Sequence, residues 1–82
     1  MRLAAAANLL TPAYLAILDR GYSVREDGGL LFATRGDDTF MAEDTILLLG
    51  VIALAEARGE NWRATDEQIA DFVARFGSSS DA

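Results

Sequence analysis

The stretch YSVREDGGLLFATRGDDTFMA, residues 22–42, decides the fold class of this chain. Apolar and polar residues alternate over Tyr22–Arg25, which is the pattern of a half-buried strand. Turns that contain Gly and Asp then separate two further apolar segments, Leu30–Arg35 and Thr39–Ala42. We therefore expect these residues to form a short antiparallel meander of three strands.

The loop length of the first hairpin determines which residues face one another. A three-residue loop at Glu26–Gly28 pairs Val24 with Leu30, which places apolar side chains opposite each other. A two-residue loop at Asp27–Gly28 would pair Val24 with Leu31 instead. We expect the first of these two registers.

Helical patterns precede the strands. Residues Pro12–Arg20 carry a broad apolar face, with Thr11 suited to the N-cap and Pro12 to the first helical position. Ala and Leu dominate Leu3–Leu10, and both residue types have high helix propensity. The sequence therefore predicts a kinked or two-part first helix.

The segment after the strands, Thr45–Arg58, predicts a second helix with Asp44 as its N-cap. Its first turns have no polar face, and a helix of this kind is buried on all sides. A strip of small residues runs along it at helical spacing: Gly50, Ala53 and Ala57. We expect another element to approach closely there.

A capping-box pattern at Thr65–Gln68 opens a third predicted helix, Asp66–Phe76. Its apolar residues recur at the spacing of one helix face: Ile69, Phe72, Val73 and Phe76. The chain is thus expected to be a small α+β protein of order α-β-β-β-α-α, with its helices packed mainly on one face of the meander. We expect residues 1–77 to form a single globular domain and residues 78–82 a disordered C-terminal tail.

The composition excludes several kinds of chemistry, because the 82 residues include no His, no Cys and no Lys. A thiolate nucleophile, an imidazole base and a Schiff-base lysine are therefore all absent. We expect a protein that is not an enzyme and that binds no cofactor. Seven basic and thirteen acidic residues give a formal net charge of −6, which disfavours nucleic acid and anionic membranes as partners.

The acidic residues suggest one candidate role, that of an acidic inhibitor or immunity-type protein that binds a basic partner. Its candidate patch comprises eight residues: Asp37, Asp38, Glu43, Asp44, Glu60, Asp66, Glu67 and Asp71. The first four are the densest group of oxygen ligands, but their spacing does not match a calcium-binding loop. A turn and a helix cap explain them locally, so we expect no metal site.

The apolar content favours a different role, because 51% hydrophobic residues exceed what one small core absorbs. We expect a protein–protein interaction or structural module that self-associates, most simply as a cytoplasmic homodimer. The interface candidates on the second sheet face are Leu31, Ala33 and Met41, unless the segment Leu3–Leu10 covers them. The last candidate is Trp62, which either caps the core or anchors an interface.

Overall fold

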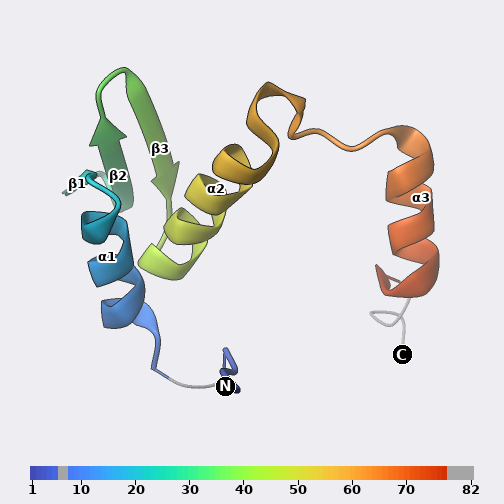
Figure 1. Cartoon of the computed structure of the whole chain (residues 1–82), viewed down its shortest axis with the longest axis horizontal. Coiled ribbons are helices and arrows are strands. Elements are labelled where there is room, and N and C mark those ends of the chain that lie inside the picture. The colour runs from blue at the N-terminus through green and yellow to red at the C-terminus, as the bar shows by residue number, and fades with distance from the viewer. Residues whose placement is uncertain (6–7, 78–82) are drawn as a thin grey trace.

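The computed structural model describes residues 1–5 and 8–77 of the chain (Figure 1). Its elements are α1 (Leu10–Asp19), β1 (Ser23–Asp27), β2 (Leu30–Arg35), β3 (Asp38–Ala42), α2 (Thr45–Arg58), the 3-10 turn η1 (Gly59–Asn61) and α3 (Asp66–Arg75). The predicted α+β class and the order α-β-β-β-α-α are confirmed. The tail expected at residues 78–82 lies outside the described residues.

The three strands form an antiparallel meander in the order β1-β2-β3. The β1–β2 hairpin closes through Gly28 and Gly29, and Val24 lies opposite Ala33. Both registers considered from the sequence are therefore wrong. The two glycines have φ values of 61° and 85°, and a two-residue hairpin turn of type I′ requires positive φ at both positions.

This register turns one face of the sheet toward α1 and α2, which pack on it (Figure 1). A core cluster forms between the sheet and these two helices from Ile17, Tyr22, Ala33, Leu48 and Ile52. The helices α1 and α2 therefore cover one face of the sheet, as predicted.

The other face of the sheet carries Phe32, with Arg25 opposite it on β1 and Met41 opposite it on β3. The guanidinium carbon of Arg25 lies 4.5 Å from the centroid of the Phe32 ring. This cation–π contact covers part of an aromatic ring that no helix reaches.

The first helix is shorter than predicted. It begins at Leu10, so Pro12 lies at its third position. Backbone N–H groups in the first turn have no partner within the helix, so the missing N–H of Pro12 removes no helical hydrogen bond. The described residues before Leu9 are not helical, and the prediction of a two-part helix is wrong for them. Residues 1–5 are exposed, and high propensity alone does not maintain so short a helix without packing.

The second helix begins and ends where the sequence predicts, and the Asp44 carboxylate accepts a hydrogen bond from the Leu47 N–H at 2.8 Å. The prediction that this helix is buried on all sides is wrong. Within α2, all of which is described, only Leu48 and Ile52 are fully buried. The sheet and α1 cover one side of α2, and no further layer of the described chain covers the other.

The third helix stands apart from the rest of the molecule (Figure 1). Its predicted capping box is present, with Thr65 and Gln68 each bonding to the other's backbone N–H. Among the described residues, α3 makes no extended contact with the sheet, α1 or α2. The Cα radius of gyration is accordingly 15.1 Å, compared with about 12 Å for a compact chain of this length.

Within the described part of the chain, no helix has both the length and the apolar character needed to cross a membrane.

Replacement of a core residue of α2 tests this packing. We expect Ile52→Ala to lower the free energy of unfolding by about 2–5 kcal/mol, because it leaves a cavity beneath α2. The control Leu47→Ala changes a side chain on the same helix that is 51% exposed, and we expect it to cost less than about 1 kcal/mol. Urea titrations of dilute protein, followed by circular dichroism, measure both values, and equal losses would contradict the packing.

The hairpin turn provides a second test. We expect Gly29→Ala to destabilise the chain by about 1–2 kcal/mol, because an L side chain is strained at its positive φ. The control Gly50→Ala lies within α2, where an added methyl group meets nothing within 4 Å. It is expected to stabilise dilute, monomeric protein by about 0.5–1 kcal/mol through helix propensity. The same urea titrations measure the change in the free energy of unfolding for both variants. An unchanged free energy of unfolding for Gly29→Ala would argue against the observed turn.

Candidate interaction surface

The uncovered side of α2 is an extended apolar feature of the described surface. It lies about half a helical turn from Leu48 and Ile52, and all of its residues are exposed. We call it the α2 open face, and it consists of Ile46, Leu47, Gly50, Val51, Ala53, Leu54 and Ala57. Contiguous exposed apolar surface of this kind is typical of protein interaction sites.

Small residues occupy the middle of the α2 open face. A Cβ atom added at Gly50 would have no neighbour within 4 Å, and both Ala53 and Ala57 are exposed. The close approach that the sequence predicts is therefore not made by the described part of this chain. The strip still provides the shape that a second helix needs to pack closely against α2.

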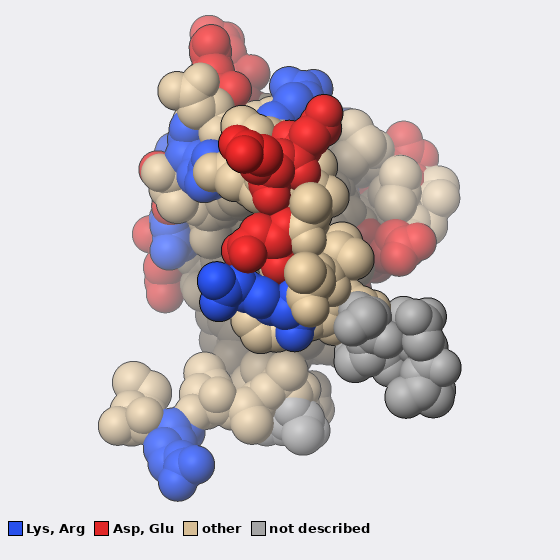
Figure 2. All heavy atoms as spheres, turned by 90° about the vertical axis from the view of Figure 1, so that its right-hand side faces the viewer, with Lys and Arg blue, Asp and Glu red and all other residues tan. Residues whose placement is uncertain are grey.

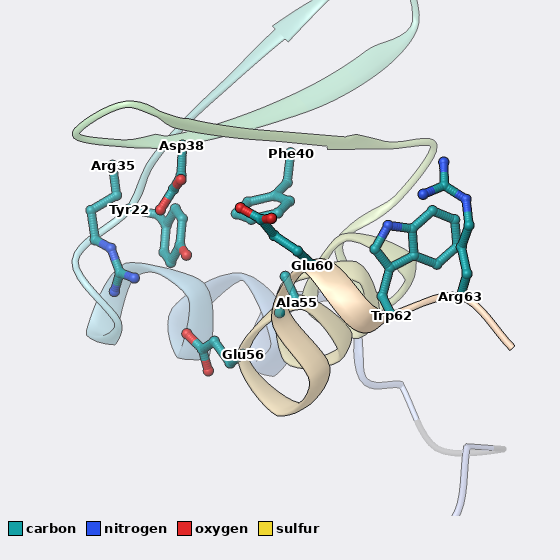
Figure 3. A pocket seen from close by; sticks show the side chains of 10 residues that line it. Tyr22, Arg35, Asp38, Phe40, Ala55, Glu56, Glu60, Trp62 and Arg63 are labelled. Atoms are coloured by element: carbon teal, nitrogen blue, oxygen red, sulfur yellow. The ribbon is translucent and has the colours of Figure 1, made fainter.

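An apolar groove of about 370 Å³ borders the C-terminal half of the α2 open face. We call it the Trp62 groove, and it is lined by Phe40, Val51, Leu54, Ala55 and Trp62. The Trp62 side chain is 46% exposed and does not belong to the core cluster. The guanidinium carbon of Arg63 lies 4.4 Å from the centroid of the Trp62 ring, so one face of this ring is already covered (Figure 3).

A third apolar surface lies on α3. Ile69, Phe72 and Val73 are 50%, 60% and 49% exposed, and we call them the α3 stripe. The ring of Phe76 extends this surface, with its centroid 5.4 Å from that of Phe72. Sequence analysis recognised this periodicity as one face of a helix and expected the helix to belong to a single globular domain.

The other side of α3 is charged. Asp66 and Glu67 lie in its first turn, and both Asp71 oxygens accept hydrogen bonds from Arg75 Nε at 3.0–3.1 Å. Figure 2 views the molecule from the side on which α3 is outermost, and acidic side chains gather on that outer surface. The charged side of α3 therefore faces solvent.

The structure divides the interface candidates that the sequence suggests on the sheet. Ala33 has no exposed surface, and Leu31 packs against the core cluster from the same face of the sheet. Met41 lies on the opposite face and is exposed. Of the sheet candidates, Met41 therefore offers the largest free surface, whereas Ala33 is not accessible to a second protein.

A polar hollow of about 600 Å³ lies between the sheet and the end of α2 (Figure 3). The guanidinium carbon of Arg35 lies 4.4 Å from the centroid of the Tyr22 ring, and Arg35 donates a hydrogen bond to the Arg20 carbonyl oxygen at 2.7 Å. Arg20 in turn forms an ion pair with Glu56. These contacts tie the α1–β1 corner to β2 and α2, so Arg35 and Glu56 of this hollow serve the fold.

The acidic residues that the sequence groups together lie at several places in the fold. Asp37 and Asp38 lie at the start of β3, and Glu43 and Asp44 follow its end. A strand of five residues separates the two pairs by about 15 Å. In the described residues, no three acidic side chains lie close enough to hold a metal ion.

In the described residues, the α2 open face and the Trp62 groove thus lie side by side. The α3 stripe lies apart from both, beyond the connection at residues 62–65. Sequence reasoning found each component but could not tell that one layer of cover is missing. The arrangement offers apolar contact area rather than reacting groups. Comparison with known protein families, with curated proteins and with solved structures finds no match to this chain.

Proposed function

We propose that this chain is a self-associating interaction module that forms a homodimer through the α2 open face. The observation that carries this proposal is that the described residues cover only one side of a fourteen-residue helix that is apolar almost all around. Water in contact with such a face raises the free energy of the single chain, and association removes that contact.

The total surface of the chain supports the proposal. A compact monomer of 8.8 kDa exposes about 4,800 Å². This chain exposes 6518 Å², which leaves an excess of about 1,700 Å². Each partner of a standard interface gives up about 800 Å², so the excess is large enough for one.

The shape of the α2 open face also suits a pair of identical chains. In a two-fold dimer the same surface patch meets its own copy, and it must therefore be self-complementary. The strip formed by Gly50, Ala53 and Ala57 allows two α2 helices to approach closely, while Leu47 and Leu54 beside it supply larger apolar side chains.

The alternative role, binding of a basic partner, depends on acidic residues that lie at both ends of β3 and on α3. We therefore base the proposal on the apolar surfaces. We further propose that the chain is not an enzyme, since Arg35 and Glu56 of its hollow are engaged in structural contacts. A cytoplasmic location is proposed because a chain without Cys suits a reducing compartment.

A charge placed on the α2 open face tests the proposal. We expect the unmodified chain to become dimeric as its concentration rises, and Leu54→Asp to stay monomeric over the same range, because an interface cannot bury an unpaired carboxylate. The matched control is Leu15→Asp, which makes the same change on the outer side of α1. Leu15 is 51% exposed and Leu54 is 42% exposed.

Sedimentation equilibrium measures the mass of each protein, and circular dichroism checks that each remains folded. The control is expected to dimerise like the unmodified chain. An unmodified chain that remains monomeric up to about 1 mM would contradict the proposed function. At that concentration, only a dimer with a dissociation constant well above about 1 mM would escape detection.

A further inference from the structure

The helix α3 needs apolar cover that the described part of its own chain does not supply. It has ten residues, and an isolated helix shorter than about 12–15 residues is only marginally stable in water. Its capping box contributes about 1 kcal/mol, which is not enough to maintain it alone. Burial of the α3 stripe is the remaining source of stability.

We infer that α3 is an arm that crosses to a second copy of the chain and packs the α3 stripe into the Trp62 groove of that copy. Each of the two copies would give one arm and receive one. This inference rests on the proposed function, since it requires two copies to associate, and it adds the contact that completes the dimer.

The two surfaces match in chemistry. The five residues that line the Trp62 groove are all apolar, and so are the three residues of the α3 stripe. Phe72 would lie among the aromatic rings of Phe40 and Trp62, whose edges and faces favour contact with a further ring.

Charge is compatible with this arrangement. When the α3 stripe faces the groove, Glu67 and Asp71 point away from it, because they lie on the opposite side of the helix. Glu67 and Asp71 then stay in water, whereas Asp66 lies at the N-terminal end of the α3 stripe, in the first turn of the helix.

The connection before α3 favours a second copy over the same chain. It spans only residues 62–65, between η1 and α3. At its start, Arg58 Nε donates a hydrogen bond to the Asn61 carbonyl oxygen at 3.1 Å, and Arg63 stacks on Trp62. At its end, the capping box holds Thr65. These contacts lead α3 away from its own α2, and short connections of this kind favour exchange between copies.

The area available is that of a standard interface. Eight exposed side chains would be covered: Ile46, Leu47, Val51, Leu54, Trp62, Ile69, Phe72 and Val73. If a fully exposed large side chain offers roughly 200 Å², their exposed fractions amount to about 750 Å² for each copy. A standard interface takes about 800 Å² from each partner.

The single tryptophan provides a direct test in the full chain, because Trp62 lines the groove. We expect its fluorescence to shift to shorter wavelength as the protein concentration rises, in step with the dimer seen by sedimentation. Val73→Asp is expected to abolish the shift and to weaken association by about tenfold or more, the factor that corresponds to burial of one large apolar side chain.

The matched control is Ala74→Asp, which places the same charge one residue later on the opposite, exposed side of α3. We expect it to retain both the shift and the association. Ile69→Asp, on the α3 stripe, should behave like Val73→Asp. None of these residues belongs to the core cluster, so circular dichroism should show that the body remains folded.

The possible results separate the two proposals. A dimer whose Trp62 emission and affinity are unchanged by Val73→Asp would overturn the exchanged arm and leave the proposed function standing. The Trp62 emission could also lie at shorter wavelength already in dilute monomer, and Val73→Asp could reverse this shift. That result would show that α3 folds back on its own chain, and it would also overturn the exchange. A chain that is monomeric at every concentration would overturn both.

Discussion

Contact of Leu48 and Ile52 with Ile17 and Ala33 is the interaction on which the rest of this structure depends. It joins one side of α2 to α1 and to the middle strand, and the remaining buried residues gather around it. A core of this size supports only a few kcal/mol of stability in so short a chain. Much of the apolar sequence therefore lies outside the core, and this distribution connects the fold to the proposed association.

Local signals in the sequence predicted several elements correctly. The bounds of α2 follow from Asp44, whose carboxylate caps its first turn, and from Gly59, whose φ of 59° suits the end of a helix. The start of α3 follows in the same way from the capping box at Thr65. These predictions succeeded because a cap is a contact among residues that are close in sequence, so no knowledge of the distant chain is needed.

The failures have the opposite cause. Apolarity around α2 indicates which residues avoid water, but it does not reveal how many layers the chain can supply to cover them. The third helix was expected within a single globular domain for the same reason, although α3 makes no extended contact with the sheet, α1 or α2 in the described chain. In the first hairpin, the adjacent Gly28 and Gly29 allow several loop placements, and only the packing of Val24 and Ala33 under the helices selects one.

The charge of the chain complements this exposed apolar surface. A net charge of −6 keeps separate copies apart, which is what a protein with an uncovered helix face needs in order to stay in solution. Association must overcome that repulsion, so it requires a large and well-matched apolar contact. The acidic side of α3 faces solvent, where salt screens it, while the α3 stripe and the α2 open face carry no charge of their own. For the dimer that we propose, repulsion over the whole surface and attraction at two uncharged patches would act together to favour a closed pair of chains over open-ended aggregation.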